Sequence, residues 1–498
     1  MTVALPDSLA AWEELASSLT LPEAMWIDGE WRAARNGETS LLVSPRDEQV
    51  IAHLPKADQV DVDDAVAGAL RAFRSGSWAG LQPRQRGEVL IRWADLLEQH
   101  RPEISALIAL EMGKPVTTAY AVEMKTTIGV IRWYGELADK LMDESPRGRT
   151  DAIAIVSREP LGVVAAITPW NFPMTLSAFK MPAALVAGNS VVLKPASQSP
   201  LSALRVAELA SEAGLPLGVL QVITGSGPVT GSALGLHRDV ATVTFTGSTG
   251  VGKQLLGYSS QSNAKPVWLE LGGKSPNIVF PDADLKTAAE TAGWAIAFNS
   301  GQMCTAGSRL VVHEDVKDQV LADVIAYFDA LTIGDPLDPT TDFGPLSSRR
   351  HQQDVLAEIT KGSETGARLV HGSTEPLDRP GWYVGPTVFD DVHADDRLAQ
   401  HEIFGPVLSV LTFRTDEEAV AIANNSDFGL GSSVWTGDLS RATRVSRAID
   451  AGLVWVNCFE EGDYSVPFGG RKLSGHGGDK SVHGLEKFTA LKTTWMAL

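Results

Sequence analysis

The sequence is poor in cysteine, in basic residues and in long apolar runs. Two cysteines among 498 residues cannot form a disulfide framework, so we expect a protein of a reducing compartment with a cytoplasmic location. The formal net charge of −19 opposes binding to nucleic-acid phosphates, which needs clustered Lys and Arg. No apolar run approaches the roughly 18 residues of a membrane helix, no secretory signal is recognisable, and the scattered histidines lack metal-ligand spacing. We therefore expect no nucleic-acid partner, no membrane span and no metal site.

Short apolar strands alternate with amphipathic helices along most of the chain. A hairpin with Asp28-Gly29 at its turn comes first, and helical patterns follow at 61–73 and 83–111. From about residue 160, strands and helices alternate in one series up to 270 and in a second series beyond it. Strands rich in β-branched residues that alternate with helices predict mostly parallel sheets covered on both faces. The chain is long enough for two or three domains, and the two series predict two of α/β class.

The stretch FTGSTGVGKQ, residues 245–254, nearly matches a phosphate-binding P-loop. A P-loop NTPase needs a Ser or Thr hydroxyl after the lysine to hold magnesium, but Gln254 follows Lys253 here. The spacing of Gly247 and Gly252 also differs from the dinucleotide fingerprint G-x-G-x-x-G, although a glycine turn that opens a helix can still bind a pyrophosphate. The alternative is a turn made only for tight packing.

Three residues have the chemistry of a nucleophile, a general base and an oxyanion donor. Cys304 lies among small and hydroxyl residues after a helical pattern at 282–299, where loop N–H groups can stabilise a thiolate or an oxyanion. Glu270 leaves an apolar strand into a Gly-Gly turn, where partial burial raises a carboxyl pKa toward that of a base. Asn171 lies between aromatic residues and prolines, which hold its amide still. Taken singly, the three also fit a buried core thiol, a solvated strand end and a turn asparagine.

Seven motifs in order along nearly the whole chain resemble those of the NAD(P)-dependent aldehyde dehydrogenase superfamily. They are PWNFP (169–173), KPAS (194–197), FTGSTGVG (245–252), LELGG (269–273), GQMC (301–304), EIFGP (402–406) and PFGGRKLSG (467–475). The resemblance implies an α/β fold with a Rossmann-type cofactor domain, an α/β catalytic domain and small oligomerisation arms. The implied domains are residues 1–137 and 158–270 for the cofactor, 271–478 for catalysis, and 138–157 and 479–498 for the arms. A homodimer or homotetramer is implied as well.

The resemblance also implies catalytic roles. Cys304 attacks the aldehyde carbonyl, while the Asn171 amide and the Cys304 backbone N–H hold the oxyanion. After hydride transfer to nicotinamide, Glu270 activates the water that hydrolyses the thioester, so the product is a free acid; CoA-acylating relatives lack this carboxylate. Lys180 stands where the family often has a proton-relay or structural lysine. The rivals are a Cys–His hydrolase, for which no histidine motif is present, and an inactive member, which would lack the nucleophile or the base.

The cofactor contacts follow from the same resemblance. The adenosine, pyrophosphate and nicotinamide ribose contacts are Trp170, Lys194, Ser197, Gly227, Gly247, Ser248, Gly252, Glu402 and Phe404. NAD-preferring members carry Glu where this chain has Ser197, and that carboxylate binds the adenosine ribose and repels a 2′-phosphate. With no carboxylate there and Lys194 nearby, a 2′-phosphate is acceptable on electrostatic grounds. We predict that NADP is used well, alone or beside NAD.

The segment 454–495 resembles the branch that acts on γ-glutamyl-aminobutyraldehyde and related aminoaldehydes. In the family this segment borders the substrate tunnel, where a carboxylate such as Glu460 favours an amino group on the substrate; a solvated acidic loop is the alternative. A dicarboxylate semialdehyde, as in succinate-semialdehyde dehydrogenases, is less favoured because the arginine those members carry before the lysine is absent, although Arg471 leaves it open. An apolar or aromatic aldehyde is favoured instead by four candidates for the tunnel wall, Phe172, Phe179, Phe298 and Phe468.

Overall fold

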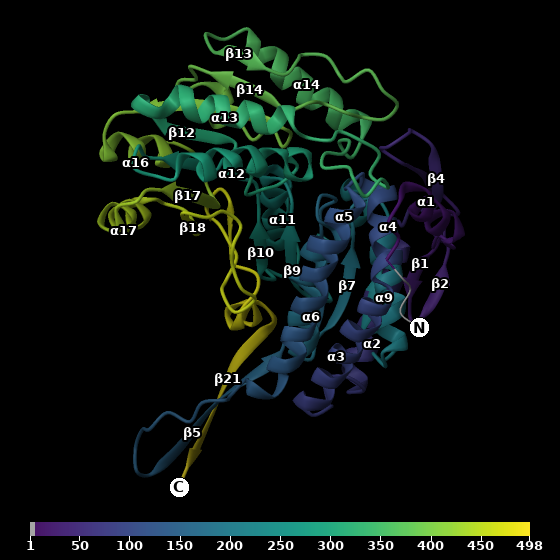
Figure 1. Cartoon of the computed structure of the whole chain (residues 1–498). Coiled ribbons are helices and arrows are strands. Elements are labelled where there is room, and N and C mark those ends of the chain that lie inside the picture. The colour runs from purple at the N-terminus through teal and green to yellow at the C-terminus, as the bar shows by residue number, and fades with distance from the viewer. Residues whose placement is uncertain (1–4) are drawn as a thin grey trace.

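A computed structural model describes residues 5–498, so the first four residues of the implied cofactor domain lie outside the described part (Figure 1). The first domain is built on a sheet of order β2-β1-β8-β7-β6-β9-β10-β20. Strands β6, β7, β8, β9 and β10 run parallel, whereas β1, β2 and β20 pair antiparallel, with β2 and β20 at the two edges. The predicted hairpin joins β1 and β2, with Asp28 and Gly29 in left-handed conformations at its turn. The strands are β1 (Met25–Ile27), β2 (Glu30–Arg32), β6 (Val163–Ile167), β7 (Ser190–Lys194), β8 (Leu220–Val222), β9 (Val240–Thr246), β10 (Val267–Glu270) and β20 (Gly475–His476).

Helices cover both faces of this sheet. Along β6, Val164 and Ala166 pack against α3, α4 and α6 to α9, whereas Val163 and Ala165 pack against α2, α10 and α11. The predicted helix at 83–111 is divided near His100, because a proline in the first turn of α4 cannot continue α3. The helices are α2 (Gln59–Ser75), α3 (Pro83–Gln99), α4 (Arg101–Met112), α5 (Val116–Thr118), η1 (Ala119–Met124), α6 (Lys125–Leu137), α7 (Pro173–Ala178), α8 (Met181–Val186), α9 (Leu201–Glu212), η3 (Gly227–Gly231), α10 (Ser232–Leu236) and α11 (Thr249–Gln261).

The second domain is built on a sheet of order β13-β14-β15-β12-β11-β17-β18, parallel except for β13. Along β12, Leu310 and Val312 pack with α12 and α13, while Val311 packs with α16 and α17. Strands are β11 (Pro276–Val279), β12 (Arg309–His313), β13 (Arg368–His371), β14 (Thr387–Asp390), β15 (Val407–Phe413), β17 (Gly431–Trp435) and β18 (Leu453–Val456). Helices are α12 (Leu285–Ala297), η4 (Phe298–Gly301), η5 (Glu314–Val316), α13 (Lys317–Asp329), α14 (Arg349–Ser363), α15 (Arg397–Gln400), α16 (Asp416–Asn424) and α17 (Leu439–Ala448).

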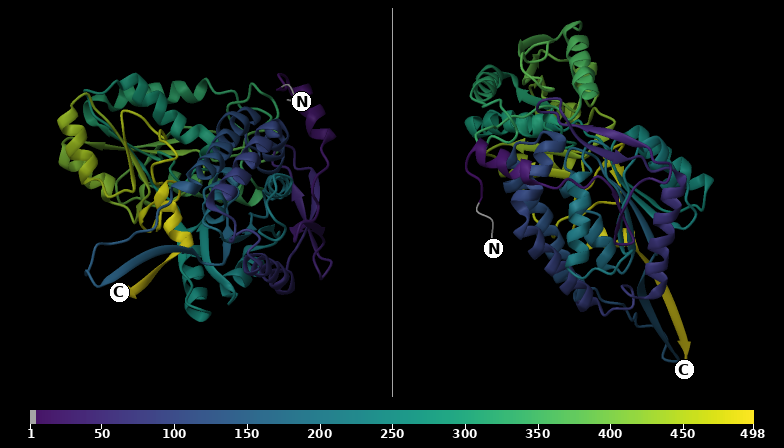
Figure 2. Two further views of the ribbon diagram at one scale, coloured as in Figure 1. Left: turned by 90° about the horizontal axis from the view of Figure 1, so that it is seen from below. Right: turned by 90° about the vertical axis from the view of Figure 1, so that its right-hand side faces the viewer.

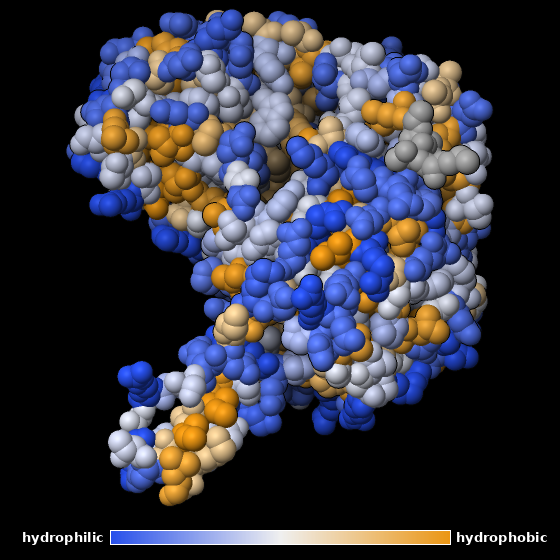
Figure 3. All heavy atoms as spheres, turned by 60° about the horizontal axis from the view of Figure 1, so that its bottom comes forward, coloured by the Kyte–Doolittle hydropathy of each residue, from blue (hydrophilic) through white to orange (hydrophobic). Residues whose placement is uncertain are grey.

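A two-stranded ribbon projects from the body of the protein (Figures 1 and 2). It pairs β5 (Ala152–Pro160) with β21 (Thr489–Ala497) in antiparallel register over the full length of both strands. Its side chains include several exposed apolar residues, seen in Figure 3 on the projecting segment. The other small elements are α1 (Leu9–Ser18), η2 (Ala138–Lys140), the pair β3 (Thr39–Val43) and β4 (Val50–Pro55), and the pair β16 (Phe428–Gly429) and β19 (Arg471–Lys472).

The chain returns from the second domain to the first before it ends. Strand β20 pairs with β10 through Leu269 and Glu270, and η6 (Val482–Phe488) then packs on the helical layer of the first domain. The C-terminal segment therefore lies directly beside the end of β10. Among the described residues, no helix is both long and apolar enough to cross a membrane.

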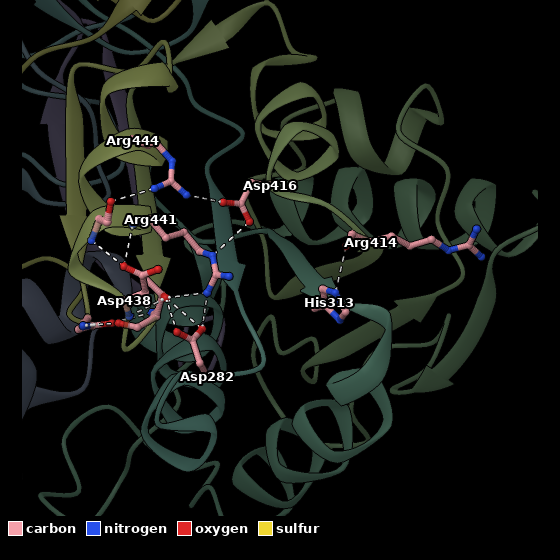
Figure 4. A network of polar contacts seen from close by, with 10 residues as sticks. Asp282, His313, Arg414, Asp416, Asp438, Arg441 and Arg444 are labelled. Atoms are coloured by element: carbon pink, nitrogen blue, oxygen red, sulfur yellow. Dashed lines mark hydrogen bonds and ion pairs between the residues drawn. The ribbon is translucent and has the colours of Figure 1, made fainter.

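An ion network holds helices α16 and α17 to the end of β11 (Figure 4). Arg441 donates to Asp282 at 2.8 Å and to Asp416 at 3.1 Å, and Arg444 donates to Asp416 at 3.1 Å. Each of these charges has an opposite partner, and none of the residues lines the cavity described below. We interpret this network as structural.

Candidate active site

A cavity of about 490 Å³ lies between the two domains. The first domain contributes the PWN stretch before α7 and the glycine turn before α11, and the second contributes the Cys304 loop, α14 and the segment after α15. Seven of the predicted site residues line this cavity: Trp170, Asn171, Gly247, Ser248, Cys304, Glu402 and Phe404. Five of the seven motifs, distant in sequence, thus meet at one site.

The loop that carries Cys304 has a constrained backbone. Helix α12 ends at Ala297, before the predicted end at 299, because Asn299 and Ser300 take left-handed φ values of 53° and 55°. Such conformations cost about 1 to 3 kcal/mol and persist where surrounding contacts impose them. Here Ser300 Oγ donates to the Gly344 carbonyl oxygen at 2.8 Å, and Asn299 Nδ2 donates to that of Asn171 at 3.0 Å. These bonds fix the turn just before Cys304.

The Gly-Gly turn after Glu270 allows three segments to approach closely. A Cβ on Gly272 would lie 2.0 Å from Glu402 Oε2, and a Cβ on Gly273 would lie 2.2 Å from the Cys304 carbonyl oxygen. The Gly273 N–H donates to Glu402 Oε1 at 2.8 Å. Because no larger residue fits at either position, the turn brings β10, the Cys304 loop and Glu402 together.

Asn171 is fixed at both its backbone and its side chain. Its carbonyl oxygen accepts hydrogen bonds from Lys114 Nζ and Asn299 Nδ2, each at 3.0 Å, and its own Nδ2 donates to the Gln302 carbonyl oxygen at 2.9 Å. An amide nitrogen carries two hydrogens, so one remains for an oxyanion. Asn171 is buried and shares the cavity wall with Cys304. This is the fixed donor that oxyanion stabilisation requires.

The Cys304 thiol retains its proton in this environment. Burial, followed by the charges of Glu460, Glu402 and Glu270, raises the pKa of the thiol well above its usual range. Burial and the three carboxylates together therefore outweigh the loop N–H groups that were expected to stabilise a thiolate. A base must take the thiol proton when the sulfur attacks.

Glu270 is buried at the end of β10, and neither of its carboxylate oxygens has a hydrogen-bond partner among the described residues. Burial and the charge of Asp479 raise its pKa from 4.5 to about 8, opposed by the charges of Lys487 and Lys180. The predicted burial and raised pKa are both present. A carboxyl with this pKa has the proton affinity of a general base near neutral pH.

Aromatic rings and a carboxylate define one end of the cavity. The Trp170 ring lies edge-on to Phe404, with centroids 5.4 Å apart, and His351 lies 5.1 Å from Trp170. His351 Nε2 is 2.8 Å from the Phe404 carbonyl oxygen, a contact that holds Phe404 at its left-handed φ of 60°. Burial raises the pKa of Glu402 to about 7, against the Gly273 N–H and the charge of Lys274.

Three of the remaining cofactor candidates, Ser197, Gly227 and Lys194, lie near one another but are not part of the cavity lining. Ser197 Oγ donates to the Gly225 carbonyl oxygen at 3.0 Å, just before Gly227, which is exposed at the start of η3. Lys194, at the end of β7, is buried, and burial lowers its pKa to about 8. Gly252, the last cofactor candidate, has a packing role, because a Cβ at this position would lie 2.8 Å from Leu271 Cδ2. It packs α11 against the end of β10, and its contact with a cofactor stays a prediction.

The four phenylalanine candidates form two aromatic groups. Phe172 stacks on Phe298 with centroids 6.1 Å apart, and Trp294 lies 4.7 Å from Phe298. Phe179 and Phe468 are 5.8 Å apart. The structure therefore pairs these residues, while their contact with substrate stays a prediction.

Glu460 reaches the Cys304 loop from the segment after β18. It has a left-handed φ of 57°, and its Oε1 is buried without a hydrogen-bond partner among the described residues. Burial raises its pKa, against a hydrogen bond with Thr305 and the charge of Lys480. The bond to Thr305, the residue after Cys304, and the buried oxygen place Glu460 against the Cys304 loop rather than in a solvated loop.

The structure adds Asp479, Lys487 and His351, which no motif indicated. The predicted Lys180 is buried and donates to Asp479 at 2.8 Å, and Lys487 donates to the other oxygen of the same carboxylate. His351, in α14, lines the cavity. Asp479 and Lys487 lie far from Lys180 in sequence, and His351 lies in a polar helix with no local signal, so linear spacing could not reveal these three residues.

Residues 31–494 match the model of the aldehyde dehydrogenase family, and the chain belongs to this family. It is an NAD(P)-dependent aldehyde dehydrogenase with the expected α/β fold. In agreement, Lys253 is exposed and does not line the cavity, so the glycine turn does not serve as a P-loop.

Its relatives include members of the branch that the C-terminal segment resembles. The chain is 45% identical over 491 residues to the NADP/NAD-dependent aldehyde dehydrogenase PuuC of Escherichia coli (strain K12), covering 98% of this chain and 99% of that protein. It superposes with a TM-score of 0.97 and 48% identity on γ-glutamyl-γ-aminobutyraldehyde dehydrogenase from Burkholderia cenocepacia, covering 99% of this chain and 100% of that one. An indole-3-acetaldehyde dehydrogenase in complex with NAD+ gives a TM-score of 0.98 at 49% identity, with coverages of 99% and 100%.

Proposed function

We propose that the chain oxidises its aldehyde through a thioester on Cys304. The Cys304 thiol gives its proton to solvent, the sulfur attacks the carbonyl carbon, and Asn171 Nδ2 and the Cys304 backbone N–H donate to the oxyanion. A bound nicotinamide supplies the hydride acceptor. Glu270 then takes a proton from the water that attacks the thioester, the sulfur leaves as thiolate, and the acid is released. The observation that carries this assignment is that Asn171 and Cys304 share one cavity wall with Gly272, two residues after Glu270, and that Gly273 touches the Cys304 backbone.

Two variants test the roles separately. Cys304→Ser is expected to abolish formation of reduced cofactor, because the sulfur nucleophile is lost. Glu270→Gln is expected to produce one rapid equivalent of reduced cofactor per site and then very slow turnover, because hydride transfer precedes hydrolysis. Stopped-flow absorbance of the reduced cofactor measures both. Turnover by Cys304→Ser would contradict the assigned nucleophile, and sustained turnover without a burst in Glu270→Gln would contradict the assigned base.

The chain's own residues fit a dinucleotide cofactor. Thr246 Oγ1 at the cavity is buried without a hydrogen-bond partner, and Glu402 offers a carboxylate oxygen beyond the one that accepts from Gly273. Gly227 and Gly250 have no atom within 4 Å of a Cβ position, so their surroundings leave room for phosphates at two turns that begin helices. Glu402 and Phe404 would hold the nicotinamide ribose, and Lys194 and Ser197 the adenosine half.

The residues at the adenosine end support good use of NADP beside NAD. Position 197 carries a hydroxyl already bonded to the Gly225 carbonyl oxygen, and Lys194 in the same motif is a buried ammonium. A 2′-phosphate would meet a cation and no carboxylate from position 197, and it would favour the charged form of Lys194.

Steady-state kinetics with both cofactors test this preference. For the wild type, we expect kcat/KM for NADP to lie within a hundredfold of that for NAD. Ser197→Glu should shift the ratio of the two kcat/KM values toward NAD by about tenfold or more, because the new carboxylate would repel the 2′-phosphate by roughly 1.4 kcal/mol or more. Ser197→Ala is the matched control, because it removes the hydroxyl without adding charge. An unchanged ratio in Ser197→Glu would exclude position 197 as its cause.

For the substrate, we infer an aldehyde with an amino group. The Glu460 carboxylate has an oxygen without a partner among the described residues, and the ring of the preceding Phe459 lies 6.3 Å from that of Trp294. Carboxylate and rings provide charge and π-face partners for an ammonium group. The resemblance to γ-glutamyl-γ-aminobutyraldehyde dehydrogenase supports this class. An apolar aromatic aldehyde is the second candidate, because of the four phenylalanines and the likeness to an indole-3-acetaldehyde dehydrogenase. A succinate-semialdehyde-type substrate is the third.

A panel of ω-aminoaldehydes, aromatic aldehydes and succinate semialdehyde, each with Glu460→Gln, discriminates among the three. If the ammonium pairs with Glu460, the variant loses about tenfold or more in kcat/KM for aminoaldehydes and little for aromatic aldehydes. Glu461→Gln, at an exposed neighbour, is the control. Equal losses for all three classes would contradict ammonium recognition by Glu460.

We also propose that the chain forms a homodimer or homotetramer through the β5–β21 ribbon. Leu491 and Trp495 on this ribbon expose 65% and 58% of their surface, and Ile153 exposes 41%. A projecting ribbon with this many exposed apolar side chains is stabilised by a second copy. Light scattering coupled to size exclusion measures the mass, and a monomer at micromolar concentration would contradict the proposal.

A further inference from the structure

A buried charge cluster beside the proposed base contains a lysine to which the mechanism above gives no role. Asp479 Oδ2 accepts from Lys180 Nζ at 2.8 Å, and Asp479 Oδ1 accepts from Lys487 Nζ. The side chains of Lys180, Asp479 and Lys487 expose 1%, 0% and 3% of their surface. Each oxygen of one carboxylate is therefore occupied by a different ammonium, in an interior with almost no access for water.

Glu270 adjoins this cluster. A Cβ on Gly469 would lie 3.0 Å from Glu270 Oε1 and 2.7 Å from Gly478, the residue before Asp479. Because neither oxygen of Glu270 has a hydrogen-bond partner among the described residues, burial and then the neighbouring charges set its proton affinity. The titratable groups around it are Lys180, Lys487, Asp479 and the Cys304 thiol, with the Tyr134 hydroxyl near Asp479.

The charges of the cluster balance only when Glu270 is ionised. Asp479 neutralises one of the two ammonium groups, and the other leaves a positive charge in the interior, which is costly unless an anion compensates it. An ionised Glu270 provides that anion, because two carboxylates then face two ammonium groups. Without the charge of Lys487, ionisation of Glu270 would instead give the cluster a net negative charge.

We propose that Lys487 is a positioning residue for thioester hydrolysis: held by Asp479 Oδ1, it places the second ammonium that allows Glu270 to lose its proton inside the protein. The proposal rests on Glu270 as the base. The ammonium of Lys180 is enough to balance the charge of Asp479. The ammonium of Lys487 is therefore left to stabilise the ionised form of Glu270. The causes of the Glu270 pKa shift agree with this role. Burial and the charge of Asp479 raise this pKa, and the charge of Lys487, followed by that of Lys180, lowers it.

The experiment follows hydrolysis and hydride transfer separately against pH in the full-length enzyme. Lys487→Gln keeps a hydrogen-bond donor without the charge, and Lys487→Met removes both. In either variant, the pH midpoint for hydrolysis should rise by about one unit or more, so that hydrolysis at pH 7 slows about tenfold and recovers by pH 10. The first-turnover burst of reduced cofactor should keep its wild-type rate. Lys487→Arg, which keeps the charge, should restore the wild-type midpoint.

Several outcomes would overturn the proposal. A wild-type midpoint in Lys487→Gln, with only a lower melting temperature, would give Lys487 a structural role alone. If neither uncharged variant folds, Lys487→Arg decides, because a shifted midpoint despite the retained charge would contradict the charge argument. Glu270→Gln measured in parallel separates the two proposals: sustained hydrolysis in that variant would show that Glu270 is not the base, whatever Lys487 does.

Discussion

Replacing Glu270 with Gln is expected to stabilise the fold, and to do so more as the pH rises. Burial and the charge of Asp479 raise the Glu270 pKa from 4.5 to about 8, so the folded protein holds a proton that the unfolded chain has released. A carboxyl whose pKa is raised on folding contributes stability that is fully present below about pH 4.5 and is lost as the pH rises through 8. The amide introduced by Glu270→Gln does not titrate, so the variant avoids this loss.

The expected size follows from the same shift. Between the unfolded and folded pKa values, the free energy of unfolding falls by about 1.4 kcal/mol per pH unit, which gives about 3 kcal/mol between pH 5.5 and 8. With an unfolding entropy of about 2.1 cal/mol/K per residue, a chain of 498 residues changes its melting temperature by roughly 1 °C per kcal/mol. The melting temperature of the Glu270→Gln variant should therefore exceed that of the wild type by about 3 °C more at pH 8 than at pH 5.5.

Differential scanning fluorimetry at a fixed scan rate measures this difference. Glu461→Gln is the control, because it makes the same chemical change at an exposed side chain. If the advantage of the Glu270→Gln variant is constant from pH 5.5 to pH 8, the reasoning is refuted, because Glu270 would then titrate alike in the folded and unfolded states.

Three further outcomes are expected. Wild-type kcat should rise about fiftyfold from pH 6 to pH 8 where hydrolysis limits turnover, because the ionised fraction of Glu270 rises from about 1% to about 50%; a flat steady-state profile would contradict this. Asn171→Ala should lower kcat about 100-fold to 1000-fold through loss of an oxyanion donor, while the Kd for NAD, measured by calorimetry, changes little. Gly273→Ala should lower the free energy of unfolding by about 1 to 3 kcal/mol and abolish turnover, because its Cβ would lie 2.2 Å from the Cys304 carbonyl oxygen; a folded, active variant would argue against the tight turn.

The sequence predicts most of the fold because the strands of a covered parallel sheet are continuous apolar runs. Strands β6, β7 and β11 are fully buried, and each was expected from its run of apolar residues. Strand β20 was not expected, since Gly475 and His476 form a two-residue strand with no pattern of their own. Its position depends on the edge of β10 that it covers, which is a property of the assembled sheet.

Some residues of the site could likewise be predicted from the sequence, and others could not. Cys304, Glu270 and Asn171 belong to short motifs, so their chemistry is readable in a linear sequence. Asp479 and Lys487 gain their significance only from Lys180, which approaches them from about 300 residues away. Composition and spacing carry no information on such a contact.

The ribbon and the charge cluster are consecutive in the chain, which raises the question of whether assembly affects catalysis. Helix η6 ends at Phe488, one residue after Lys487 and one before the start of β21. The Phe488 ring is fully buried, and its carbonyl oxygen accepts a hydrogen bond from Asn189 Nδ2 at 2.9 Å. These contacts lie within the first domain, so they anchor η6 independently of the ribbon.

Oligomer formation and the pH dependence of hydrolysis should therefore be separable. Replacing both Leu491 and Trp495 with Asp places charges on the exposed face of β21 and should lower the mass measured by light scattering. The pH midpoint for hydrolysis should stay at its wild-type value, because Phe488 still holds Lys487 against Asp479. A midpoint that rises in the dissociated enzyme would mean that η6 depends on the neighbouring subunit, and the anchoring by Asn189 would then be insufficient.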